Sequence, residues 1–96
     1  MTAPRLTHGG LYLANPFRPN STISLVLEQS TNVHASIYDV HGGRVRTLVD
    51  DVFPAGLHEV IWNALSEDGR PASSGIYYMR VDIGSEQIRR KRLLVR

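Results

Sequence analysis

The amino-acid sequence predicts an all-β fold, an antiparallel β-sandwich of about seven strands. Two observations support this prediction. Apolar and polar residues alternate with a period of two in one stretch after another, and no stretch shows the sustained period of about 3.6 residues that indicates a helix. Glycine, proline, asparagine and aspartate separate these stretches at the spacing expected of short strands joined by turns.

Length and composition are those of one ordinary folded domain. The 96 residues are enough for a single hydrophobic core, and 42% of them are hydrophobic. No apolar run approaches the ~18 residues of a membrane span. The chain has no cysteine, which excludes disulfides and thiol chemistry. Its first residues lack the apolar segment of a signal peptide, so we expect it to be a fragment of a longer protein.

Six stretches carry the period-two alternation, and five of them align apolar residues on one face. These aligned residues are Ile23, Leu25 and Leu27 in 22–28; Val33, Ala35 and Ile37 in 32–38; Val60 and Trp62 in 58–63; Tyr77, Met79 and Val81 in 75–81; and Leu93 and Val95 in 89–95, after Arg89 and Lys91. The stretch 43–49 is short and is expected near a sheet edge. Residues 15–21 contain two prolines and are expected to form an edge strand or to lead into a strand.

The turns between these stretches follow from their glycines. Gly42 and Gly43 can supply the positive φ of a tight hairpin. Residues 53–56 and 67–75 are longer loops, and in the second we expect Asp68 to cap the backbone and Gly69 to take a positive φ.

A tyrosine pattern makes the sandwich prediction more specific. In Ig-like domains a tyrosine near the start of a late strand lies two residues before a core position, and its hydroxyl bonds back to the backbone. Gly75, Tyr77 and Met79 have this relation. We therefore expect an Ig-like, Greek-key sandwich. Trp62, the only tryptophan, should be the largest contributor to its core.

Charge is unevenly distributed along the chain. Residues 1–88 carry six Lys and Arg against nine Asp and Glu, whereas the last eight residues add five cations, at Arg89, Arg90, Lys91, Arg92 and Arg96. This segment is open to three interpretations: the solvated face of an edge strand, a segment read by another protein, or a nucleic-acid contact. No aromatic residue is interleaved with the cations and no helix is evident, so nucleic acid is not an expected partner.

Short motifs occur in a specific order along the chain. They are Asn15-Pro16-Phe17, Tyr38-Asp39-Val40, the glycine turn before Val45, Ala55-Gly56, Trp62, Asp68-Gly69 and Ser74-Gly75-Ile76-Tyr77. In this order and spacing the chain closely resembles the C-terminal sorting domain (type A) of proteins exported by the type IX secretion system. It is also similar to the Ig-like domain of the flagellar hook-capping protein. The resemblance covers residues 13–96, so we expect these to form the domain and residues 1–12 to be an N-terminal linker or an artificial extension.

The resemblance implies a non-catalytic C-terminal module of a larger bacterial protein that is secreted or held at the cell surface. Its partners would be the upstream domain of that parent protein and export machinery at the outer membrane, reached through a signal peptide elsewhere in the parent. No cofactor is implied. The sorting signal would comprise Lys91, Arg92, Leu93, Leu94, Val95 and Arg96.

Three departures from the family pattern are visible. Asn63-Ala64 follows Trp62 where Asp-Gly is usual, His41-Gly42-Gly43-Arg44 replaces a single-glycine turn, and Arg92 stands where an apolar residue commonly follows the lysine. The first two concern loop geometry, and the third bears on whether the signal is read.

Two further functions stay open. The domain could be a structural assembly module of the hook-cap type, and its edge strands could support weak self-association. Alternatively, Tyr12, Tyr38 and Tyr78 could form a platform for sugar rings in an accessory carbohydrate-binding module.

No catalytic, cofactor-binding or metal-binding residue is expected. The carboxylates that could bind Ca²⁺ lack the spacing of a calcium loop; they are Asp39, Asp50, Asp51, Glu67 and Asp68. The histidines His8, His34, His41 and His58 are scattered, and no Gly-x-Ser-x-Gly nucleophile motif occurs.

Overall fold

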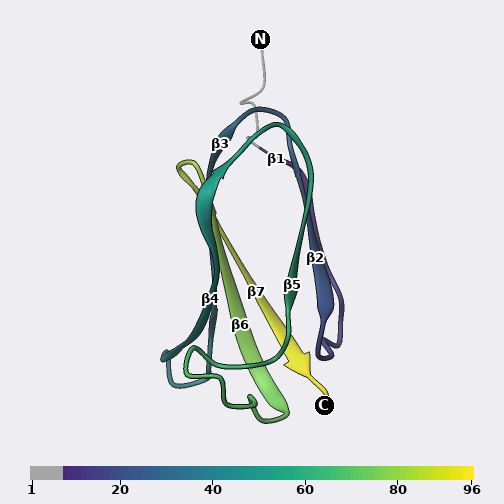
Figure 1. Cartoon of the computed structure of the whole chain (residues 1–96), viewed down its shortest axis with the longest axis vertical. Helices are drawn as coiled ribbons and strands as arrows, with labels where there is room; N and C mark the ends of the chain where they lie inside the picture. The colour runs from purple at the N-terminus through teal and green to yellow at the C-terminus, as the bar shows by residue number, and fades with distance from the viewer. Residues whose placement is uncertain (1–7) are drawn as a thin grey trace.

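The fold is a β-sandwich of seven strands in two antiparallel sheets, as the sequence predicts (Figure 1). A computed structural model describes residues 8–96. The strands are β1 (His8–Leu13), β2 (Ser21–Leu27), β3 (Thr31–Tyr38), β4 (Arg44–Phe53), β5 (Gly56–Trp62), β6 (Gly75–Ile83) and β7 (Glu86–Leu94). One sheet has the order β1-β2-β5 and the other β4-β3-β6-β7, so the chain crosses between sheets after β2, β4 and β5. The part of the chain that the structure describes contains no helix able to span a bilayer.

The alternating sequence pattern explains which faces are buried. Ile23, Leu25 and Leu27 of β2 and the corresponding residues of β3 point into the space between the sheets, and intervening residues are half-buried or exposed. Successive strand residues point to opposite faces, so one apolar row per strand is enough to build the core. Ser36 breaks this rule, because it is fully buried on the outer face of β3.

Trp62 is buried in the core at one end of the sandwich. Its ring meets Phe17 and Tyr77 in edge-on contacts, with centroids 6.3 and 5.7 Å away. The indole Nε1 donates to the Leu65 carbonyl at 3.1 Å, so its polar group is satisfied. This cluster joins the segment before β2, the end of β5 and the start of β6.

The tyrosine pattern has the geometry expected of an Ig-like domain. The hydroxyl of Tyr77 donates to the carbonyl of Ser73, four residues upstream, at 2.7 Å. The ring is half-buried, while Met79, two residues later, is fully buried. Gly75 begins β6 with a φ of 154° and pairs with Leu94.

The first strand includes residues that the resemblance leaves outside the domain. β1 begins at His8, and Gly10 to Leu13 pair with Val26 to Ile23 of β2. The remainder of the segment 1–12, residues 1–7, lies outside the described part of the chain.

Candidate functional site: the last strand and the face beside it

The basic segment forms β7, an edge strand that pairs with β6 (Figure 1). In the sequence, Leu93 lies in one row with Arg89 and Lys91. In the structure this row lies on the outer face of the sheet, and Leu93 is 43% exposed. Leu94 has no exposed surface, and β7 contributes Leu94 and Ile88 to the core. The reason is tertiary: the registration with β6 places Leu94, Arg92, Arg90 and Ile88 on the inner side.

The far end of β7 is held by the segment before β2. Phe17 donates its N–H to the Leu93 carbonyl and accepts from the Val95 N–H, both at 2.8 Å, in a short parallel pairing. Residues 15–21 therefore lead into β2, as expected, and also cover the last part of this edge.

The rest of the β7 edge is capped by its own arginines. Because backbone groups alternate in direction along a strand, the carbonyls of Arg89 and Lys91 point outward, like that of Leu93. Arg90 Nη1 donates to the Arg89 carbonyl at 2.9 Å, and Arg92 Nη1 donates to the Lys91 carbonyl at 2.8 Å. Within residues 8–96, the Nε of Arg92 is buried without a hydrogen-bond partner. Charged caps of this kind protect an edge against unwanted strand pairing.

Arg96 anchors the end of the chain to the loop that follows β5. Its Nη1 donates to the carbonyls of Ala64 at 2.9 Å and Ala72 at 3.0 Å, and its backbone N–H donates to Ser74 Oγ at 3.1 Å. Residues 91–96, the expected sorting signal, thus combine two kinds of residue. Lys91 and Leu93 are exposed, whereas Leu94 and Arg96 fasten the strand to the domain.

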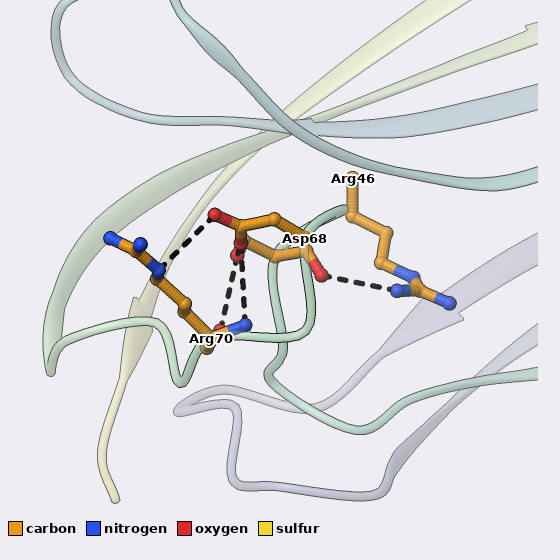
Figure 2. Close-up of polar contacts among 4 residues, drawn as sticks. Arg46, Asp68 and Arg70 are labelled. Carbon is orange, nitrogen blue, oxygen red and sulfur yellow. Dashed lines mark hydrogen bonds and ion pairs between the residues drawn. The ribbon is translucent and has the colours of Figure 1, made fainter.

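The loop that receives Arg96 is well braced (Figure 2). Asp68 accepts from the Ser66 hydroxyl and from the Arg70 N–H, and its carboxylate forms an ion pair with Arg70. The bond from Ser66, followed by that from Arg70, lowers the pKa of Asp68. From β4, Arg46 donates to the Ser66 carbonyl at 3.2 Å. Gly69 has a φ of 84°, so Asp68 and Gly69 form the predicted turn.

The candidate metal ligands are not brought together. Among residues 8–96, no group of three or more His, Asp or Glu side chains is placed to hold a metal ion. Asp39 accepts from the N–H groups of His41 and Gly43 at 2.9 Å, which shapes the β3–β4 turn. His58 stacks on Phe53, and its Nε2 lies 2.7 Å from the Pro54 carbonyl.

Two of the three candidate platform tyrosines lie together. Tyr38 of β3 and Tyr78 of β6 are direct partners on the outer face of the larger sheet, whereas Tyr12 belongs to β1 in the other sheet. The pair borders an open hollow of about 470 Å³ that is also lined by Asp39 and Val40 of the turn, and by Arg80 and Arg89. The sequence does not indicate that these arginines lie beside the tyrosines. Only the strand register places Arg80 opposite Arg89 and Tyr78 opposite Lys91.

Comparison with known proteins identifies relatives of this domain. The family model for the FlgD Ig-like domain matches residues 19–86. Dimeric latent PorU from Porphyromonas gingivalis contains a similar fold (TM-score 0.73, 22% identity), covering 98% of this chain and 10% of PorU. PorZ, an essential surface component of the type IX secretion system of the same organism, is also similar (TM-score 0.56, 25% identity), with 91% of this chain and 12% of PorZ covered. A search among curated proteins found no match. The chain thus spans about a tenth of the length of these two solved structures.

Proposed function

Because the chain belongs to the FlgD Ig-like domain family, we propose that it is a non-catalytic C-terminal module that directs a larger protein to the bacterial surface or the medium. Similarity to part of PorZ supports a connection with type IX secretion. The similarity to PorU, at 22% identity, supports the fold alone. The partner would be export machinery at the outer membrane, and the parent protein would carry its own signal peptide.

The observation that carries this proposal is that some residues of 91–96 anchor the strand while others are exposed. Leu94 and Arg96 hold the strand in place, and Lys91 and Leu93 stand exposed on its outer face. A receptor would therefore meet a cation and an apolar side chain in a defined geometry on a folded domain. A rigid epitope binds with a smaller loss of conformational entropy than a flexible tail does.

The same geometry determines how the proposal should be tested. Deleting residues 91–96 would remove Leu94 from the core and the Arg96 anchor, so loss of export could reflect unfolding. A better variant is Lys91→Ser with Leu93→Ser, which changes only exposed side chains. Arg44→Ser with Leu57→Ser is the matched control, because it removes an exposed cation and an exposed leucine outside the loop that holds Arg96.

The measurement is export of a reporter in a host with type IX secretion. The reporter carries a signal peptide and is followed by residues 1–96 or a variant. We expect the wild-type and control fusions to reach the surface or the medium, and the Lys91 and Leu93 variant to stay in the periplasm with unchanged circular dichroism. Export of that variant at the wild-type level would contradict the assigned signal. Retention of the folded wild-type fusion would contradict the sorting function itself.

The family match also supports a second candidate, a structural assembly module like the hook-cap domain it is named for. In that case the sandwich would contribute contacts between subunits of a larger polymer. Light scattering of residues 1–96 across a concentration series would test it. A mass that rises with concentration would support assembly, and a constant monomer mass would argue against it.

A further inference from the structure

We propose that the hollow beside Tyr38 and Tyr78 binds an acidic sugar residue, such as a uronic acid within a polysaccharide. The hollow lies on the outer face of the larger sheet, between the β3–β4 turn and the adjoining parts of β6 and β7. This binding function is independent of the sorting function and involves other side chains.

The two tyrosines supply apolar ring surfaces with a polar hydroxyl at the edge of each. Tyr38 and Tyr78 are direct cross-strand partners, and neither ring contacts another aromatic ring within the described part of the chain. Tyr78 is 41% exposed, so its ring is accessible from solvent. An aromatic face carries negative potential, which favours contact with the C–H bonds on one face of a sugar ring. No hydrogen bond engages either hydroxyl within residues 8–96, so both can bond to sugar hydroxyls.

The arginines determine the charge of the ligand. Arg80 lies opposite Arg89, and its Nε donates to Asp82 at 3.3 Å, which orients Arg80 and partly neutralises it. Arg89 is exposed and forms no ion pair within the described residues. A guanidinium binds a carboxylate through two parallel hydrogen bonds. Arg89 is therefore the group that would hold the carboxylate of the sugar, while the rings hold its apolar face.

Asp39 favours a sugar over a nucleic acid. Its Oδ1 is engaged by the N–H groups of His41 and Gly43, and its Oδ2 has no hydrogen-bond donor among residues 8–96. A carboxylate oxygen accepts hydrogen bonds from sugar hydroxyls and repels anionic groups. A uronic acid residue carries a single carboxylate, which Arg89 can bind while hydroxyls face Asp39, whereas a nucleic acid carries a phosphate on every nucleotide. The size of the hollow, about 470 Å³, also suits one or two rings rather than a run of nucleotides.

The test is a calorimetric or NMR titration of the full chain with trigalacturonate. Maltotriose serves as the neutral sugar and a ten-residue oligothymidylate as the nucleic acid. Tyr78→Ala and Arg89→Ala change the hollow, and Tyr12→Ala is the matched control, because Tyr12 is an exposed tyrosine on the other sheet. Far-UV circular dichroism checks that each variant is folded.

We expect wild type to bind trigalacturonate at least tenfold more tightly than maltotriose. Either change in the hollow should weaken this binding about tenfold or more, and Tyr12→Ala should leave it unchanged. The proposal is overturned if trigalacturonate does not bind, if maltotriose binds equally well, or if Tyr12→Ala weakens binding as much as Tyr78→Ala. Tighter binding of the oligothymidylate that is lost in Tyr78→Ala would also overturn it, in favour of a nucleic-acid site. None of these results depends on reporter export.

Discussion

Strands β6 and β7 are paired neighbours of nine residues each, and their inner faces differ sharply. The inner row of β6 contains Tyr77 and the buried apolar residues Met79, Val81 and Ile83. The inner row of β7 has buried residues near its two ends, Ile88 and Leu94, and arginines between them. Position in the sheet explains this, since β6 has a partner on each side and β7 lies at the edge. A central strand is constrained by packing, whereas an edge strand can carry residues selected for other roles.

The largest effect is expected where the start of β6 meets the core. Trp62→Ala removes the ring that packs on Tyr77 and Phe17 and should lower the free energy of unfolding by about 3–5 kcal/mol. Urea unfolding followed by circular dichroism would measure it. Ile61→Ala changes the exposed neighbour and serves as control. A loss below about 1 kcal/mol in Trp62→Ala would show that the cluster is not the main support of this end.

A direct pair across the two strands provides the sharpest comparison. Met79 lies opposite Arg90 in the β6–β7 ladder. Met79→Ala should cost about 2–5 kcal/mol because it opens a cavity in the core. Arg90→Ala should change stability by only about 0.5 kcal/mol, because its side chain is exposed and bonds only the edge carbonyl of Arg89. Equal losses in urea unfolding would mean that β7 supports the core as strongly as β6.

A smaller effect is expected from the hydroxyl at the start of β6. Tyr77→Phe removes the bond to the Ser73 carbonyl but keeps the ring, so we expect a loss of about 1 kcal/mol in urea unfolding. Tyr12→Phe is the control, because no hydrogen bond engages its hydroxyl within the described residues. Unchanged stability in Tyr77→Phe would show that this bond does not brace β6.

The same hydroxyl predicts a dependence on alkaline pH. Burial, followed by the negative charge of Asp39, raises the pKa of Tyr77 above its ordinary value of 10.0. The folded state therefore retains this proton at pH values where the unfolded chain releases it. The stabilisation is complete below pH 10.0 and is lost as pH rises above it. Wild type should lose stability more steeply than Tyr77→Phe in this range, and parallel pH profiles would contradict the assignment.

The turn after Trp62 shows that both local sequence and tertiary contacts determine backbone conformation. Ala64 follows Trp62 and Asn63, at the position where sorting domains usually have glycine. Its φ is 61°. Alanine is rarely found in this left-handed region because its Cβ approaches the following carbonyl. The Asn63 side chain accepts from the Leu65 N–H at 3.0 Å, and Ala64 is fully buried, so surrounding contacts hold the turn without a glycine.

The sequence by itself determined the fold class and the apolar rows of β2, β3 and β6. Period-two alternation, turn residues and the tyrosine pattern are local signals, and local signals are enough to define a strand and its apolar face. The rows through Leu25, Val33 and Met79 were all predictable in this way. For the basic segment, residues 89–96, the sequence predicted only a concentration of positive charge.

Only the tertiary structure determined which residues lie beside the cations of residues 89–96. Strand register placed Leu94 in the core and Leu93 in solvent, and it set Lys91 and Arg89 beside Tyr78 and Arg80. The contacts of Phe17 with β7 and of Arg96 with the loop after β5 join segments far apart in the chain. A shift of one residue in register exchanges the two faces of a strand. Because β7 has arginines on both faces, its sequence alone does not indicate which face points toward the core.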